Sequence, residues 1–122
     1  MNQKNFTQKS QEAIQAAQML SREYGNPQIE QAHLLYALLD QENGLIPQLV
    51  TSMGPGPASL KAAVKAELQR MPRVGGAGRE ADKVYISRDM DRALTRADEI
   101  AGEMKDEFLS VEHLFLGLID AA

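Results

Sequence analysis

Helical periodicity dominates the pattern of apolar and polar positions along this chain. Between Thr7 and Tyr24, small and apolar residues fall three or four apart and form one stripe. Thr7 is a suitable N-cap, and Gly25-Asn26-Pro27 ends the helix because proline disfavours helical geometry in the residue before it. The same spacing predicts five more helices, at about Gln31–Gln41, Leu45–Met53, Pro57–Met71, Ser87–Met104 and Ser110–Ile119. No strands are predicted, so the fold class is all-α.

A long irregular segment separates two groups of helices. It runs from Pro72 to Tyr85 and contains Gly75-Gly76-Ala77-Gly78 among alternating charges. Such a composition is typical of an exposed linker.

An internal repeat is the strongest signal in the sequence. Thr7–Asp40 aligns without a gap with Ser87–Asp120, 80 residues later, and seven of 34 positions are identical. The identical pairs include His33/His113, and apolar substitutions such as Ile14/Leu94 and Leu20/Ile100 stay in phase. We therefore predict two copies of one helical unit packed about a pseudo-twofold axis. They form a single domain over residues 1–122, with repeat 1 at about 6–71, a linker at 72–86 and repeat 2 at about 87–122.

The second repeat looks incomplete beside the first. Repeat 1 continues past Asp40 with two more helices, whereas the sequence stops two residues after Asp120. The period predicts that the natural chain continues for roughly 25–30 more residues. Without them the last helix would keep an apolar face, which a neighbouring copy is expected to cover.

Composition excludes several classes of function. The chain has 122 residues, a net charge of −4 and no cysteine, which fits one domain without disulfides or thiolate-bound zinc and is compatible with a cytoplasmic location. An acidic chain lacks the basic surface that nucleic acid needs, and the densest apolar segment, Ala32–Leu39, is too short to span a membrane. Met19, Met90 and Met104 lie at helical spacing and are expected in the core.

Candidate catalytic and cofactor chemistry is sparse. The glycine clusters lack the Gly-Lys-Ser/Thr of a phosphate-binding loop, so no nucleotide or other cofactor is expected in this chain. A metal site across the pseudo-twofold is one interpretation of His33 and His113. Zinc needs three or four closely spaced ligands, so boundary positions of helices are the favoured interpretation. A binding or scaffolding role follows, with a small helical hydrolase using His33 or His113 as the alternative from a different class.

Two segments carry a resemblance to a known family. Glu30–Leu39 and Ser110–Ile119 resemble the paired units of the Clp amino-terminal domain family, and Leu68–Gly78 is similar to the linker of its ClpB-type disaggregase members. The resemblance implies an eight-helix domain of two four-helix units, tethered to a hexameric AAA+ ring whose following modules bind ATP and Mg. It also implies binding of unfolded or aggregated proteins in an apolar groove, transfer to the ring, and work in the stress response beside a co-chaperone. Docking of a folded adaptor, and simple self-association, are the alternatives among binding roles.

The same resemblance suggests the site residues. Thr7, Asp106 and Glu112 match a polar trio that borders the substrate groove, and Leu94 and Ile100 match apolar positions that flank it. His113 departs from the ClpB-type pattern, in which an apolar residue can occur. Each position also has a structural interpretation: Thr7 as an N-cap, Glu112 as a first-turn carboxylate, Asp106 in a turn, and the two apolar residues as core.

Overall fold

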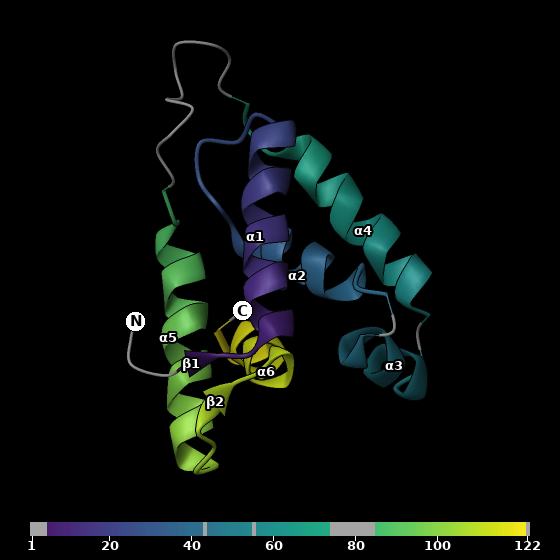
Figure 1. The fold of residues 1–122 in the computed structure, drawn as a ribbon. Helices are drawn as coiled ribbons and strands as arrows, with labels where there is room; N and C mark the ends of the chain where they lie inside the picture. The colour runs from purple at the N-terminus through teal and green to yellow at the C-terminus, as the bar shows by residue number, and fades with distance from the viewer. Residues whose placement is uncertain (1–4, 43, 55, 74–84, 122) are drawn as a thin grey trace.

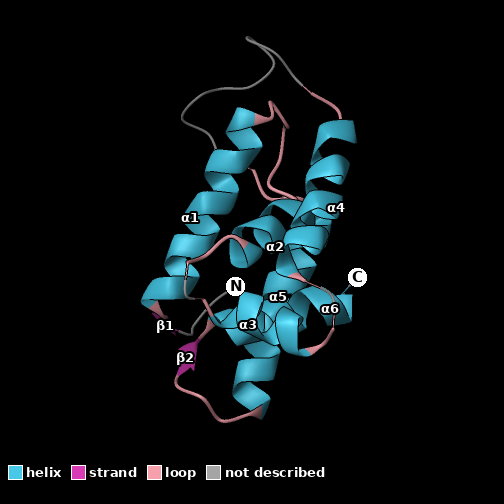
Figure 2. Cartoon of the chain, turned by 90° about the vertical axis from the view of Figure 1, so that its right-hand side faces the viewer, coloured by secondary structure: helices cyan, strands magenta, loops and turns pink. Residues whose placement is uncertain are grey.

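The computed structural model describes residues 5–42, 44–54, 56–73 and 85–121, and within them the chain forms six α-helices (Figures 1 and 2). The helices are α1 (Gln8–Glu23), α2 (Gln31–Leu39), α3 (Leu45–Ser52), α4 (Pro57–Arg70), α5 (Arg88–Glu103) and α6 (Val111–Ala121). Every predicted helix is present to within about two residues, which confirms the all-α class. Most of the predicted linker, residues 74–84, lies outside the described residues.

The prediction of no strands is wrong at one place. β1 (Asn5–Phe6) pairs in parallel with β2 (Phe108–Leu109), and an isolated bridge joins Ile29 to Ile86. These pairs are at most two residues long and join segments far apart in the chain. No alternating pattern can develop over two residues, so hydrophobic periodicity could not reveal them.

α1 and α5 begin in the same way. Thr7 and Ser87 are N-caps with extended backbone (φ −67°, ψ 163° and φ −66°, ψ 161°). Their hydroxyl oxygens accept from the backbone N–H of Ser10 (3.2 Å) and Met90 (3.0 Å). Each cap satisfies one of the donors that a helix start leaves without an intrahelical partner.

The two helices also end alike. Backbone N–H groups three residues beyond each helix reach back to the last turn, from Asn26 to Ser21 and from Asp106 to Ala101, both at 2.9 Å. This closure requires a left-handed residue just before, which is Gly25 (φ 67°) in one helix and Lys105 (φ 59°) in the other. Lys105 is the single non-glycine residue with positive φ in the described ranges.

Backbone hydrogen bonds join the first helix pair, α1 and α2, to the second helix pair, α5 and α6. Thr7 N–H donates to Leu109 O (3.0 Å), and Ser87 N–H donates to Ile29 O (3.1 Å). The two bonds exchange partners under the 80-residue shift, since 7 pairs with 87 and 29 with 109. A pseudo-twofold axis would produce this arrangement, while duplication of an ancestral unit and the domain boundaries stay predictions.

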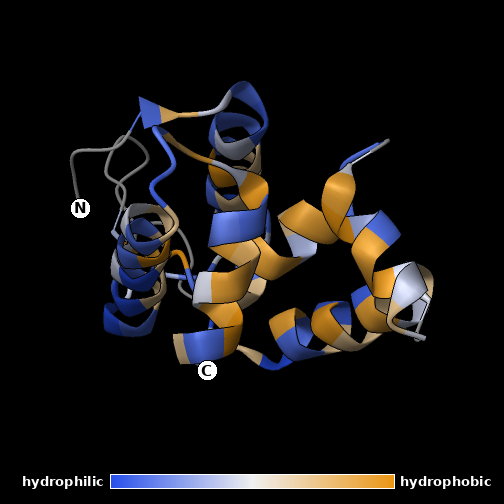
Figure 3. Ribbon diagram, turned by 90° about the horizontal axis from the view of Figure 1, so that it is seen from below, coloured by the Kyte–Doolittle hydropathy of each residue, from blue (hydrophilic) through white to orange (hydrophobic). Residues whose placement is uncertain are grey.

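Small residues bring α5 and α6 unusually close. Ala93 and Ala97 on α5 are buried, and a Cβ added to Gly117 of α6 would lie 2.6 Å from Ala93 O and 2.9 Å from Ala97 N. The core continues through leucines of three helices, Leu34, Leu38, Leu68 and Leu114. α6, which ends at the C label in Figure 3, is largely hydrophobic, and its Leu116 and Ile119 are exposed.

The methionine prediction holds for one of three residues. Met90 is 1% exposed and lies in the core, but Met19 and Met104 are 63% and 51% exposed. Met19 lies on the side of α1 that faces away from the buried Ala13 and Ala17, and Met104 is the C-cap of α5. No helix in the described ranges is long and apolar enough to cross a bilayer.

Candidate functional site

The β1–β2 pair places the start of α1 beside the segment that connects α5 to α6 (Figure 1). The Thr7 hydroxyl donates to Ser10 Oγ (3.0 Å), and Ser10 Oγ donates to Leu109 O (3.0 Å). Together with the backbone bond from Thr7 to Leu109, these contacts fix the first turn of α1 against β2. Thr7 therefore lies close in space to residues about 100 positions later.

A shallow cavity of about 320 Å³ opens at that connection. Its lining comprises Lys105, Asp106, Glu107, Phe108, Ser110, Glu112 and His113. The structure thus brings together three of the predicted site residues, Asp106, Glu112 and His113. Three carboxylates against one lysine make the cavity acidic, and Phe108, 49% exposed, supplies an apolar surface within it.

His113 lies beneath the surface of this cavity. Its side chain is 2% exposed, Nδ1 accepts from the backbone N–H of Ser110 (2.9 Å), and Nε2 lies 2.8 Å from Asp106 Oδ2. Because a backbone N–H can only donate, Nδ1 must carry the lone pair, and the neutral ring then donates from Nε2 to the carboxylate. His113 orients Asp106 and is not itself an exposed wall of the cavity.

Leu94 and Ile100 are not brought to the same cavity. Leu94, 5% exposed, touches a separate hollow of about 340 Å³ whose other lining residues are Phe6, Gln11, Ile14 and Gln15. Ile100 is partly buried and lines neither hollow. The two hollows lie near each other, since Phe6 of the apolar hollow pairs with Leu109, the neighbour of Phe108 in the acidic cavity.

Two aromatic residues escaped the sequence reasoning. Phe108 lines the acidic cavity, and Phe6 lines the apolar hollow. Both belong to the short strands, so neither carries a helical spacing signal. Their one signal is position: an aromatic residue within two residues of a helix N-cap, Thr7 or Ser110.

His33 repeats the arrangement in the first helix pair. Its Nδ1 accepts from the backbone N–H of Glu30 (2.8 Å), and its Nε2 lies 2.8 Å from Asn26 Oδ1. In both pairs the histidine takes the place of the Glu or Gln of a capping box at the third helical position. The described residues contain no group of three His, Asp or Glu side chains placed to hold a metal ion.

Ser110, His113 and Asp106 superficially resemble a catalytic triad. Ser110 Oγ lies 3.2 Å from His113 Nδ1, and Asp106 lies on the other side of the ring. A general base needs a free lone pair toward the serine hydroxyl. At His113 that lone pair already accepts the shorter bond from the Ser110 backbone N–H, so the contacts serve the helix cap.

Comparisons with known proteins agree with this fold. The model of the Clp repeat (R) N-terminal domain matches residues 5–122. The chaperone protein ClpB of Nitratidesulfovibrio vulgaris is 36% identical over 94% of this chain, which spans 13% of that protein's length.

Solved structures show the same architecture. The Hsp104 N-terminal domain from Candida albicans superposes with a TM-score of 0.85 at 22% identity, covering 97% of this chain and 75% of that one. The N-terminal domain of the ClpV1 ATPase of the E. coli EAEC Sci1 type VI secretion system superposes with a TM-score of 0.81 at 18% identity, covering 95% and 68%. The matched length and the identity to ClpB show that this chain belongs to the Clp repeat N-terminal domain family, as it occurs in ClpB-type chaperones.

Proposed function

We propose that this chain is the client-recognition domain of a ClpB-type disaggregase, and that the cavity at the α5–α6 connection receives unfolded polypeptide. The observation that carries the proposal is the exposed Phe108 beside Asp106 and Glu112, held next to the Thr7 cap by the β1–β2 pair. An apolar ring flanked by carboxylates suits an extended segment, since the ring packs on apolar side chains while carboxylates accept from backbone N–H groups. Such a site reads exposed apolar groups and extended backbone and does not need one particular sequence.

Weak binding is expected of such a shallow site. Removing on the order of 400 Å² of apolar surface from water contributes about 10 kcal/mol before costs, at roughly 25 cal/mol/Å². Association and ordering of the client offset much of that, which leaves micromolar or weaker affinity. Weak binding allows the ring to pull the client away from the domain, and six tethered domains together restore avidity.

The remainder of the proposal concerns the whole protein. ATP and Mg would be bound in AAA+ modules outside this sequence, and the domain would pass clients to a hexameric ring, with a co-chaperone as a further partner. We place the protein in the cytoplasm and assign this chain no catalytic step and no nucleic-acid or membrane partner. Asp106, Glu112 and Phe108 are the proposed contact residues. Thr7 lines neither hollow and acts as the cap that fixes the start of α1 beside them, His113 is the positioning residue for Asp106, and Leu94 lies at the neighbouring hollow. Ile100 lines neither hollow, and we assign it no direct contact.

An NMR titration with casein, which is largely unfolded, tests the site. We expect the amide signals of Asp106, Phe108 and Glu112 to shift in the wild-type chain, and Phe108→Ser to weaken binding about fivefold or more. Met53→Ser is the matched control, because Met53 is also an exposed apolar residue (63%) but is the C-cap of α3 and lines none of the hollows described above. Signals that move elsewhere while these three stay still would refute the site.

Adaptor docking is the alternative binding role. A folded adaptor would give one saturable interface that unfolded casein does not compete for. The hydrolase alternative predicts turnover that His113→Ala or His33→Ala abolishes in a broad esterase and phosphatase screen. Inactivity in that screen is the expected result.

A further inference from the structure

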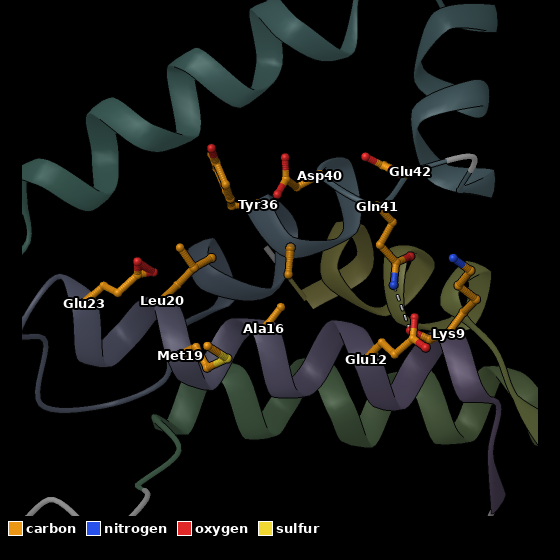
Figure 4. Close-up of a pocket in the computed structure, with 11 residues that line it drawn as sticks. Lys9, Glu12, Ala16, Met19, Leu20, Glu23, Tyr36, Asp40, Gln41 and Glu42 are labelled. Atoms are coloured by element: carbon orange, nitrogen blue, oxygen red, sulfur yellow. Dashed lines mark hydrogen bonds between the residues drawn. The ribbon is translucent and has the colours of Figure 1, made fainter.

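A second, larger groove lies on the α1–α2 pair, with α4 nearby (Figure 4). Its volume is about 460 Å³. The lining comprises Lys9, Glu12, Ala16, Met19, Leu20, Glu23, Tyr36, Ala37, Asp40, Gln41 and Glu42. It shares no lining residue with the cavity at Phe108, so an occupant here would be bound independently of the client site proposed above.

The groove combines an apolar floor with an acidic rim. Ala16, Met19 and Leu20 of α1 supply apolar surface, and Met19 is 63% exposed. Four carboxylates against one lysine line the groove: Glu12, Glu23, Asp40 and Glu42, with Lys9. Among these carboxylates the described ion pairs engage Asp40 alone, through Lys61 Nζ at 2.7 Å.

At the equivalent place on the α5–α6 pair, the carboxylates bind an arginine of the same chain. Arg96 stands 80 residues after Ala16, and its guanidinium binds three carboxylates: Asp120 through Nε, and Glu99 and Glu103 through Nη1 at 3.2 Å each. Hydrogen bonds from Asp120 first, then Glu103 and Glu99, raise the pKa of Arg96 above its usual value.

Two of these three carboxylates recur at the groove. Glu103 and Asp120 stand 80 residues after Glu23 and Asp40, while the third, Glu99, corresponds to Met19. The α1–α2 pair therefore keeps two of the carboxylates and has alanine where the arginine would be. Glu23 has no ion pair among the described residues, and Lys61 bonds to Oδ1 of Asp40, so an incoming guanidinium would share Asp40 with Lys61.

We propose that the α1–α2 groove binds a partner protein through an arginine side chain carried on an apolar segment. The guanidinium takes the place between Glu23 and Asp40 that Arg96 takes between Glu103 and Asp120, and neighbouring apolar side chains pack on Met19 and Leu20. Arginine fits better than lysine because its planar fork reaches two carboxylates at once, as Arg96 does.

The test uses a fluorescein-labelled dodecapeptide of alanine, leucine and serine with one central arginine. Its partner probe has citrulline in place of arginine, which keeps the shape and removes the charge. We expect saturable binding of the arginine peptide by fluorescence anisotropy, and about tenfold weaker binding of the citrulline peptide. Equal binding of the two peptides overturns the proposal, and so does an arginine peptide that stays unbound at a millimolar concentration of this protein.

Variants locate the binding on the chain. Ala16→Arg supplies the missing guanidinium from α1 itself and should weaken peptide binding at least tenfold. Gln18→Arg adds the same charge two residues away, at a position that lines none of the hollows described above, and should change binding less than twofold. Glu23→Gln is a conservative surface change and should weaken binding about threefold to fivefold, which keeps the proposal testable if Ala16→Arg folds poorly. Unchanged binding in both groove variants overturns it.

The remaining outcomes concern the occupant. Peptide binding that survives both groove variants but is lost in Phe108→Ser would show that the peptide uses the client site, which overturns the second site and leaves the proposed function intact. Concentration-dependent dimerisation that Ala16→Arg abolishes would show that a second copy fills the groove, which overturns the proposed occupant.

Discussion

In the α1–α2 pair, the histidine at the helix start faces an amide, and in the α5–α6 pair the equivalent histidine faces a carboxylate. His33 and Asn26 are both buried, at 0% and 1% exposure, and Asn26 Nδ2 also donates to Pro72 O (2.9 Å). Asp106, the partner of His113, keeps 44% of its side chain exposed. The same cap thus carries a neutral partner where water is excluded and a charged one where water is present, because burying an unpaired carboxylate is costly.

The two helix pairs also differ on their outer surfaces, in the residue at one equivalent position of α1 and α5. On α5, Arg96 covers the rim with a network of three carboxylates, while on α1 the small side chain of Ala16 leaves a groove. The arginine and its carboxylates therefore occupy the surface of α5 at the position where α1 carries the small Ala16.

Exchanging the amide and the carboxylate is the most severe test of the comparison. Asn26→Asp should lower the free energy of unfolding by about 3 kcal/mol, because it buries a carboxylate and turns the bond to Pro72 O into a repulsion between two oxygens. Asp106→Asn should cost less than about 1 kcal/mol. Urea unfolding followed by circular dichroism measures both, and equal costs would contradict the account.

Helix spacing gives the next largest difference. Gly117→Ala should destabilise the chain by about 2 kcal/mol, because the new Cβ meets backbone atoms of Ala93 and Ala97 that cannot move independently. Gly102→Ala is the matched control: its Cβ meets nothing within 4 Å, so the better helix propensity of alanine should stabilise by about 0.5–1 kcal/mol. Destabilisation by both substitutions would contradict the account, because close packing against α5 is present at Gly117 alone of these two glycines.

The left-handed residues after α1 and α5 form the third test. Lys105→Gly should raise the free energy of unfolding by about 0.5–1 kcal/mol, since glycine adopts φ 59° without steric cost. Gly25→Ala, at φ 67°, should lower it by about 1 kcal/mol. Thermal unfolding shows both signs, and a loss of stability in Lys105→Gly would mean that the lysine side chain makes a contribution larger than the backbone strain.

The smallest expected effect concerns Asp40 and its cation. The hydrogen bond from Lys61 to Asp40 raises the pKa of Lys61, so the stabilisation is complete below the ordinary lysine pKa of about 10.5 and is lost as the pH rises through the raised value. Lys61→Gln should cost about 0.5 kcal/mol at neutral pH, as for other exposed pairs.

The same unfolding measurement in alkaline buffer checks the sign of this effect. The difference between wild type and Lys61→Gln should shrink at high pH. A difference that grows would contradict the assigned direction.

Helical spacing and capping residues were enough to predict the helices. Thr7, Ser87 and the Gly25-Asn26-Pro27 stop mark helix ends within one or two residues, because caps act through local backbone geometry. The family could be identified from Glu30–Leu39 and Ser110–Ile119, because a resemblance between runs of consecutive residues needs no tertiary information. These features are local, and a sequence displays local features directly.

The candidate site was predictable only in part. Asp106 and Glu112 were expected at the cavity and line it, but Leu94 lines another hollow and Phe108 was missed. Which apolar residue is exposed depends on pairing between β1 and β2, two segments about 100 residues apart. Helical spacing likewise could not separate Met90, which is buried, from Met19, which is exposed, because both fit an apolar stripe.

By itself, the sequence determined where each helix starts and stops, the 80-residue correspondence and the chain's family, because these depend on neighbours within a few residues or on direct alignment. Tertiary structure alone decided which residues are exposed and which meet: that Ala16 borders a groove, that Arg96 binds Asp120 of another helix, and that Phe108 is exposed beside Asp106. The physical reason is that burial is a property of the packed assembly of helices, set by contacts between residues far apart in the chain.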